Sequence, residues 1–320
     1  MTVWCLHLHL QGPIATPLHS GTLFGHLCWA HRLMKGEDSL IRWLKALPES
    51  PWLISDAFPA GCLPRPLLAP ERLPRQAPEE DKAAFTERLQ KAKKQKKQSW
   101  ISVRDFLALR EGLSGEALNW RLADADEQTA ANGKVVSYHQ PHNTIHRLTG
   151  TTPETGGLYF MEERWHGKGA EKLDVYLQAP DASTEQLRHL FATIGEQGFG
   201  RDASLGRGRF SVEAIDTADS TLFQYTGNRL LSLSHGSLTS NMRAPRYKLH
   251  VHYGKLGGLF AGGVRSPFKR PLLLLKPGAT FEPAGEEPFG EWLSDVHPDH
   301  PEIGHHAWHL CLPYTETEVH

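Results

Sequence analysis

The sequence lacks an excess of either charge. Its 320 residues carry 35 lysines and arginines against 36 aspartates and glutamates, which gives a formal net charge of −1. A free-standing nucleic-acid-binding protein is usually more basic overall. Any binding of a polyanion must therefore come from local patches. Such a balance fits a subunit of a larger assembly, whose acidic faces meet other subunits.

Paired cysteines and long apolar runs are also missing. The cysteines have no CxxC spacing, so they match neither a zinc site nor a disulfide framework, and a reducing intracellular compartment is the plain interpretation. No apolar run approaches the ~20 residues that span a bilayer, and the N-terminus does not read as a signal peptide. We expect a cytoplasmic protein without cofactor, metal or membrane contact. The four cysteines are Cys5, Cys28, Cys62 and Cys311.

The pattern of apolar residues predicts the order βαββαβ, which is the ferredoxin-like order. An antiparallel sheet with helices on one face leaves its other face free, and RNA-recognition modules use that face. The predicted elements are a strand over 3–10, a helix from Thr22 to Gly36, strands over 157–165 and 173–179, a helix that Ser183 and Gln186 open as a capping box, and a strand over 210–215.

Two domains are expected from the length and from the order of these elements. The first covers 1–218 and is interrupted by a proline-rich and basic insertion at about 48–134. The second covers 219–320 and reads as a degenerate ferredoxin-like domain. Its predicted strands are 229–233, 248–253, 271–275 and 309–312, with a weak helical signal at 289–296. The fold class is α+β, with two ferredoxin-like domains and antiparallel sheets.

The segment from Gly198 to Phe210 holds four glycines and three arginines in thirteen residues. It matches no mononucleotide-binding motif, because an arginine stands where a P-loop has its lysine. Backbone N–H groups and guanidinium groups together suit RNA phosphates. The alternative is a loop whose glycines merely serve turns. The residues assigned to RNA here are Gly198, Phe199, Gly200, Arg201, Asp202, Ser204, Gly206, Arg207, Gly208 and Arg209.

Individual loop residues have separate expected roles. Arg201, Arg207 and Arg209 would hold phosphates, while Phe199 would pack either into the core or against a base. Asp202 could instead orient a neighbouring arginine.

Further candidates lie outside this loop. His19 and Ser20 precede the first helix, where they could bind a phosphate or a 2′-OH or simply cap the helix. Asn143 could read a base edge and Arg147 could stack or bind phosphate. For the neighbouring histidines we favour RNA contact or surface placement over a metal site, because Pro141 breaks the helix that would align them. These histidines are His139, His142 and His146.

Lysines form a third group, for which contact with RNA, with a partner, or with solvent alone remains open. The run from Lys91 to Lys97 could touch a nucleic-acid backbone, although most charge runs are solvated faces. The lysines considered are Lys93, Lys94, Lys96, Lys97, Lys248 and Lys269.

Several stretches together resemble the RAMP superfamily of CRISPR effector subunits, and within it the fourth subunit of the type III-A Csm complex. They spread over most of the chain. The stretches are TPLHSGTLFG (16–25), HNTIHRLTGT (142–151), the glycine-rich loop (198–210), YKLHVHYGKLGG (247–258) and PFKRP (267–271). The basic insertion near 91–97 is a departure from the pattern.

The resemblance implies a non-catalytic, RNA-binding subunit of a ribonucleoprotein that acts in antiviral defence. Such a subunit would hold the repeat-derived 5′ tag of the crRNA and meet target RNA only indirectly. Its protein partners would be the large polymerase-domain subunit and a backbone RAMP subunit.

Two other functions stay open at this point. The first is a metal-independent endoribonuclease of the same superfamily that cuts CRISPR precursor RNA, with His19 as general acid or base. The second is a protein–protein scaffold without RNA contacts.

Overall fold

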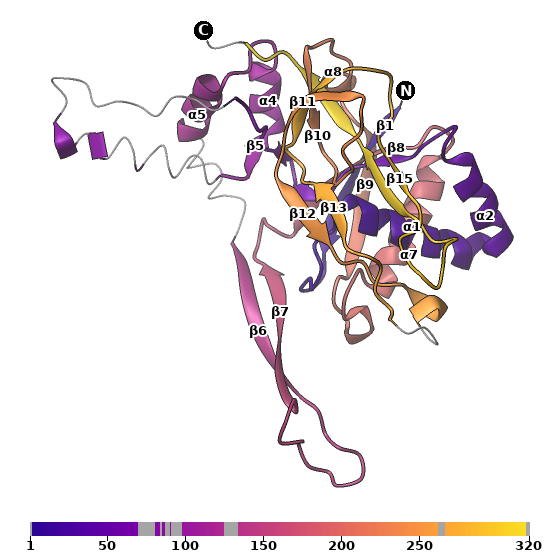
Figure 1. The fold of residues 1–320 in the computed structure, drawn as a ribbon. Coiled ribbons are helices and arrows are strands. Elements are labelled where there is room, and N and C mark those ends of the chain that lie inside the picture. Colours follow the sequence, from indigo (N-terminus) through magenta and orange to yellow (C-terminus); the bar gives the residue numbers. More distant parts are fainter. Residues whose placement is uncertain are drawn as a thin grey trace.

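The computed structural model describes residues 2–69, 81–83, 85–86, 90, 98–124, 134–261 and 266–317. A body of small sheets and helices carries one long hairpin that projects away from it (Figure 1). All strand pairs assigned in the described part are antiparallel. The expected α+β class, with antiparallel sheets, is confirmed.

The first sheet has the strand order β2-β8-β1-β9, with β3 also paired to β8. That is the arrangement of a ferredoxin-like βαββαβ unit, in which the first and third strands lie at the centre. Leu6 is opposite Val175 on one side and Ile215 on the other, and Leu6 is fully buried. The strands are β1 (Val3–Leu10), β2 (Leu53–Ile54), β3 (Phe58–Pro59), β8 (Lys172–Gln178) and β9 (Phe210–Thr217).

The second strand of this sheet was predicted in the wrong place. Residues 157–165 do form a strand, β7 (Leu158–His166), but it pairs with β6 (Val135–Asn143) in the projecting hairpin. The short strands β2 and β3 fill the position in the sheet instead. Proline is tolerated on edge strands, which explains how the proline-rich stretch that contains Pro51 and Pro59 supplies this edge.

Two helices follow the expected places along the chain. Helix α1 (Ser20–Lys35) begins after His19 rather than after Thr22 and ends at Gly36, which has a φ of +81°. Helix α7 (Thr184–Gln197) begins as predicted, with the Ser183 Oγ accepting from the Gln186 N–H at 3.2 Å. The two helices contact each other. Further helices are α2 (Glu37–Ala46), α4 (Val103–Leu109), α5 (Gly115–Asp124) and α8 (Ser220–Phe223), with 3-10 turns η2 (Ala203–Leu205) and η3 (Gly258–Ala261).

The C-terminal part is built almost entirely of strands. One four-stranded sheet has the order β11-β14-β10-β17, while β12 pairs with β13 and β15 with β16. The weak helical signal at 289–296 was wrong, since β15 lies there. The strands are β10 (Arg229–Ser232), β11 (Met242–Arg246), β12 (Leu249–His252), β13 (Leu272–Leu275), β14 (Thr280–Pro283), β15 (Phe289–Leu293), β16 (His305–His309) and β17 (Cys311–Tyr314). A further pair in the insertion joins β4 (Cys62–Pro64) to β5 (Trp100–Ser102).

The buried core is continuous between the two parts. Leu8, Phe24 and Phe191 belong to the same buried cluster as Leu231 and Trp308 of the C-terminal strands. None of the helices in the described ranges has the length and apolar character to cross a membrane.

Candidate nucleic-acid interface

The glycine-rich loop folds tightly against the segment that follows β1. A Cβ atom on Gly208 would lie 2.1 Å from the carbonyl oxygen of Phe199, and one on Gly200 would lie 2.5 Å from the Cβ of Thr16. Both glycines also have positive φ, at +68° and +76°. A side chain at either position would force the backbone apart.

Backbone N–H groups of the loop already donate within the protein. The bonds run from Phe199 N to Gly208 O (2.9 Å), Gly208 N to Pro13 O (2.9 Å), Gly200 N to His26 Nε2 (3.1 Å) and Arg201 N to the Thr16 Oγ1 (2.9 Å). These four N–H groups already have acceptors within the protein, so they are not available to a phosphate in this conformation.

His26 and Phe199 hold the loop onto helix α1. Burial lowers the pKa of His26 to about 4, so its neutral ring can accept the Gly200 N–H. The His26 and Phe199 rings lie 4.5 Å apart, and Phe199 is fully buried. Of the two roles considered for Phe199, packing into the core is the one observed, so its ring does not face RNA.

Arg207 joins the loop to the hairpin. Its Nε lies 2.6 Å from a carboxylate oxygen of Glu163, and its Nη2 donates to the Gln140 Oε1 at 2.5 Å. The side chain of Arg207 is 20 % exposed and that of Glu163 only 6 %. A charge pair this sheltered resists exchange with an external phosphate, so Arg207 is a structural residue in this conformation.

Arg201 and Arg209 are the accessible arginines of the loop. The Arg201 side chain is 47 % exposed; its Nε lies 3.2 Å from Asp202 Oδ2, and its Nη2 donates to the Glu162 carbonyl oxygen at 2.6 Å. Asp202 thus orients Arg201, which is one of the two roles considered for Asp202 from the sequence. Arg209 is exposed, and its guanidinium has no partner in the part of the chain that the structure describes.

Ser20 is fully buried at the start of α1 and serves the fold. Its N–H donates to Asp56 Oδ1 at 2.9 Å, and its hydroxyl accepts the His235 N–H at 3.0 Å. His19, one residue earlier, makes no side-chain cap. Its ring instead lies 4.1 Å from the ring of His235, and burial lowers the pKa of His19 to about 4.

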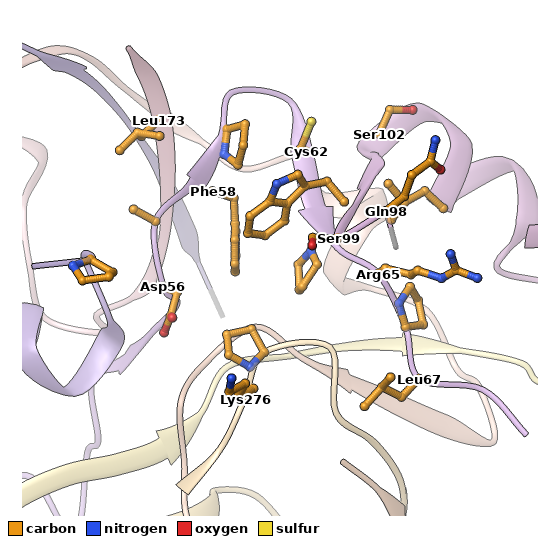
Figure 2. Close-up of a pocket in the computed structure, with 18 of the residues that line it drawn as sticks. Asp56, Phe58, Cys62, Arg65, Leu67, Gln98, Ser99, Ser102, Leu173 and Lys276 are labelled. Carbon is orange, nitrogen blue, oxygen red and sulfur yellow. The ribbon is translucent and has the colours of Figure 1, made fainter. Parts of the chain in front are cut away.

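A groove of about 1520 Å³ runs between the two parts of the chain and the insertion (Figure 2). His19 lines it, together with Lys248 and Lys276 from the C-terminal part. Four lysines and arginines line the groove against two carboxylates, which favours a polyanion. The basic residues are Arg65, Arg164, Lys248 and Lys276, and the acidic ones are Asp56 and Asp105.

Arg201 connects the loop to this groove. A small adjoining cavity of about 80 Å³ is lined by Arg201, Ile14, Pro17 and Arg164. The last three also line the large groove. The exposed guanidinium of Arg201 and the basic groove are therefore neighbours.

The other predicted residues are dispersed. Asn143 lies near the end of β6 and exchanges hydrogen bonds with the Thr152 hydroxyl at 2.7 and 3.0 Å. Arg147 is exposed in the loop of the hairpin. Lys269 donates to the Gly304 carbonyl oxygen at 2.8 Å, and burial lowers its pKa to about 8. Gly198, Gly206 and Ser204 belong to the loop itself, while Lys93, Lys94, Lys96 and Lys97 lie outside the described residues.

Residues that fix the loop were missed by the sequence prediction. Gln140 and Glu163 reach it from the hairpin, and Thr16 and His26 from the segment around α1. Each of them is far from the loop along the chain, and ordinary polar residues carry no signal of such pairing. The TPLHSGTLFG and HNTIHRLTGT stretches lie close to these partners, which is the only hint that the sequence offers.

Solved structures of known proteins share the fold of this chain. No protein-family model matches the sequence, and no curated protein matches it. The chain is similar to a chain of the Csm1–Csm4 cassette solved in complex with pppApA, with 17 % identity, a TM-score of 0.59 and coverage of 100 % of both chains. It is also similar to a chain of the Csm3–Csm4 subcomplex in the type III-A CRISPR-Cas interference complex, with 13 % identity, a TM-score of 0.57 and coverage of 98 % and 99 %.

Csm4 is the component that these two assemblies have in common, and the neighbouring chains are Csm4. At these identities the likeness concerns the fold. The chain has the fold of these Csm4 chains, in agreement with the fold that the resemblance of the sequence stretches implied.

Proposed function

We propose that this chain is a non-catalytic, RNA-binding subunit of a type III CRISPR interference complex. It holds the repeat-derived 5′ tag of the crRNA and joins the large polymerase-domain subunit to the backbone subunits. The observation that carries the proposal is the similarity of fold to chains of the Csm1–Csm4 and Csm3–Csm4 assemblies over the whole length. The groove and the exposed arginines supply the chemistry that such a role needs.

The RNA backbone is held by accessible cations. Arg201 and Arg209 offer solvent-accessible guanidinium groups at the loop, and Lys248 and Lys276 continue the positive surface along the groove. Guanidinium forks suit phosphate oxygens and impose little sequence preference. Arg207 supports this surface by fixing the loop to the hairpin, without touching RNA itself.

Partners of this chain are proposed by analogy with the neighbours, which were solved together with Csm1 and with Csm3. Exposed apolar side chains on β12 and β13 are suited to a protein contact. They include Leu249, Val251 and Leu273, which are 49 %, 46 % and 60 % exposed.

Catalysis is not part of the proposal. General acid–base catalysis at neutral pH is most efficient with a group whose pKa is near 7, whereas burial lowers the pKa of His19 to about 4. Labelled repeat RNA incubated with the purified chain in EDTA should stay intact. Specific cleavage that His19→Ala abolishes would instead establish the endoribonuclease.

The RNA-binding role is tested by a salt titration of affinity for an RNA that carries the 5′ tag. For single-stranded RNA the slope of log K against log salt concentration falls by about 0.7 for each phosphate that the protein no longer neutralises. Arg201→Gln and Arg209→Gln should each weaken binding and lower the slope by about that amount. The matched control is Arg42→Gln, an exposed arginine on α2.

The outcomes of this titration separate the hypotheses. Arg42→Gln should leave affinity and slope unchanged. If Arg201→Gln and Arg209→Gln together also leave both unchanged, the loop is not an RNA site. If the wild-type chain itself has no measurable affinity for the tagged RNA, the chain is a protein–protein scaffold.

A further inference from the structure

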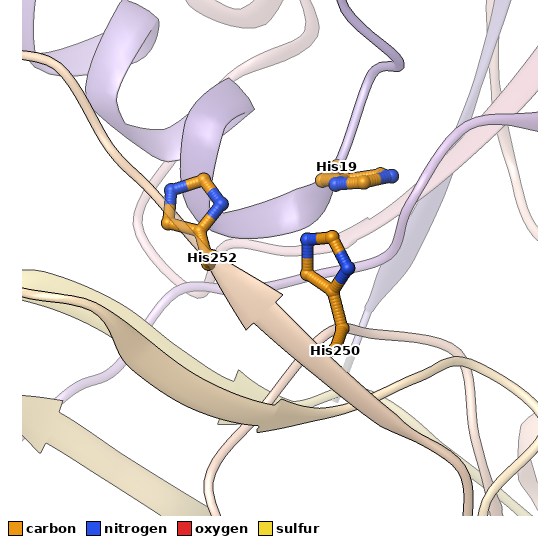
Figure 3. A group of neighbouring side chains, drawn as sticks. All are labelled: His19, His250 and His252. Atoms are coloured by element: carbon orange, nitrogen blue, oxygen red, sulfur yellow. The ribbon is translucent and has the colours of Figure 1, made fainter.

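Three histidines from distant parts of the chain converge beside the first helix. His19 directly precedes α1, and His250 and His252 lie two residues apart on β12. Figure 3 shows both β12 imidazoles on the same side of the strand, next to His19. One ring nitrogen from each residue lies within 4.8 Å of the corresponding atoms of the other two.

The three imidazoles are free to act as ligands. No hydrogen bond to their ring nitrogens is found among the residues that the structure describes. A neutral imidazole keeps a lone pair on one ring nitrogen, which is the atom that binds a metal ion.

We propose that His19, His250 and His252 form a binding site for a divalent transition-metal ion of the Zn²⁺ class. Imidazole nitrogen suits zinc, copper, cobalt and nickel, whereas calcium and magnesium prefer oxygen ligands. Tetrahedral coordination with Zn–N bonds of 2.0–2.1 Å needs ligand nitrogens about 3.3 Å apart. The three nitrogens lie within 4.8 Å of one another, so metal binding would require rotation of the side chains about χ1 and χ2 to bring them to this distance.

Residues around the three histidines support the arrangement. The Asp56 carboxylate lies 2.7 Å from the Nδ1 of His235, and the His235 ring lies 4.1 Å from His19 and 4.8 Å from His250. Among the residues that the structure describes, Asp56 bonds to His235 and to none of the three proposed ligands, so it places a negative charge near the site without orienting a ligand.

Positive groups near the site limit its affinity. Lys269 and Lys276 lie close enough to lower the pKa values of His252 and His250 respectively, after the effect of burial. The Lys269 ammonium is directed to the Gly304 carbonyl oxygen at 2.8 Å, and burial lowers its own pKa to about 8. These cations face the histidines from the 266–276 segment, and Asp56 opposes them from the β2–β3 connection.

A second group of metal-binding residue types, Cys5, His7 and Asp174, is the weaker candidate. The His7 Nδ1 already pairs with an Asp174 oxygen at 2.7 Å, and the other Asp174 oxygen accepts the Gly61 N–H at 2.7 Å. Burial also raises the pKa of the Cys5 thiol to about 12, which opposes formation of the thiolate that a metal needs.

The consequence of the site is a cross-link. A metal ion held by these ligands ties the start of α1 to β12, two elements separated by more than two hundred residues of chain. Because a ligand that binds only the folded state stabilises it, the ion should hold the N-terminal and C-terminal parts together.

The test uses the full chain, freed of metal by a chelator and then titrated with Co²⁺, whose visible absorption bands report tetrahedral coordination. We expect one stoichiometric equivalent, displaced by Zn²⁺ and accompanied by a rise in the melting temperature. His250→Gln and His252→Gln should each weaken binding by at least about tenfold. The matched control is His142→Gln in the hairpin, which should bind as the wild type does.

The variant His250→Cys distinguishes loss of a ligand from misfolding, because it replaces one metal ligand by another. A thiolate at this position should keep Co²⁺ bound and add a sulfur-to-metal charge-transfer band. The proposal is overturned if the wild type shows no stoichiometric site. It is equally overturned if His250→Gln and His252→Gln bind like the wild type, or if His142→Gln weakens binding as much as they do.

The metal site does not depend on the RNA-binding function. Its readout is metal binding by the isolated chain without RNA, so its failure leaves the proposed function untouched.

Discussion

Replacement of Arg207 by glutamine should damage the fold rather than RNA contact. The substitution removes the 2.6 Å ion pair with Glu163 and the 2.5 Å bond to Gln140. It leaves the Glu163 carboxylate, only 6 % exposed, without its cation. An unpaired buried charge in a fully enclosed site costs about 3–5 kcal/mol. Because Arg207 is itself 20 % exposed, water offsets part of this, and we expect a loss of about 2 kcal/mol.

A double-mutant cycle measures that loss. Free energies of unfolding from urea titrations would be compared for Arg207→Gln, Glu163→Gln and the double variant. The coupling energy should be about 1–3 kcal/mol, since the two side chains are in direct contact. Arg209→Gln is the control, and its stability should equal that of the wild type. If Arg207→Gln unfolds like the wild type and instead lowers the salt slope of RNA binding, Arg207 is a phosphate ligand and our assignment fails.

Two further predictions concern the same loop. Gly208→Ala should lower the free energy of unfolding by about 3 kcal/mol or more, because the new Cβ would meet the Phe199 carbonyl oxygen. Gly206→Ala, with a similar φ of +83° and no atom within 4 Å of the new Cβ, should lower it by only about 1 kcal/mol. Equal losses of stability in thermal unfolding would contradict the packing argument. The folded pKa of His26 is about 4, below the ordinary 6.5, so its contribution is complete above pH 6.5 and is lost as the pH falls toward 4. The stability advantage of the wild type over His26→Phe should therefore shrink by about 2–3 kcal/mol over that interval, and a constant difference would refute it.

The spacing of apolar and capping residues predicted those elements whose signals lie within a few residues of one another along the chain. Helix α7 begins after Ser183 because the serine oxygen and the Gln186 N–H lie within one turn, and the alternation in 3–10 marks a central strand. The location of the loop between α7 and β9 followed from the same local signals.

Long-range pairing was outside the reach of these signals. Residues 157–165 were predicted as a strand of the first sheet, yet β7 pairs with β6, because the two-residue strands β2 and β3 occupy the edge beside β8. Strands so short give no periodicity to detect.

Only part of the candidate site could be predicted, because the contacts that hold it are also long-range. Composition drew attention to the loop, but it could not tell that Glu163 holds Arg207 while Arg201 and Arg209 remain accessible. Likewise, nothing local to His19 indicated that His250 and His252 would come to lie beside it.

Site-specific crosslinking tests the central claim most directly. A photoreactive side chain would be placed at position 209 of the full chain and assembled with its crRNA and partner subunits, with position 42 as the control. The account predicts crosslinks from position 209 to the 5′ tag and none from position 42. A fully assembled particle in which position 209 attaches to no tag nucleotide would contradict it.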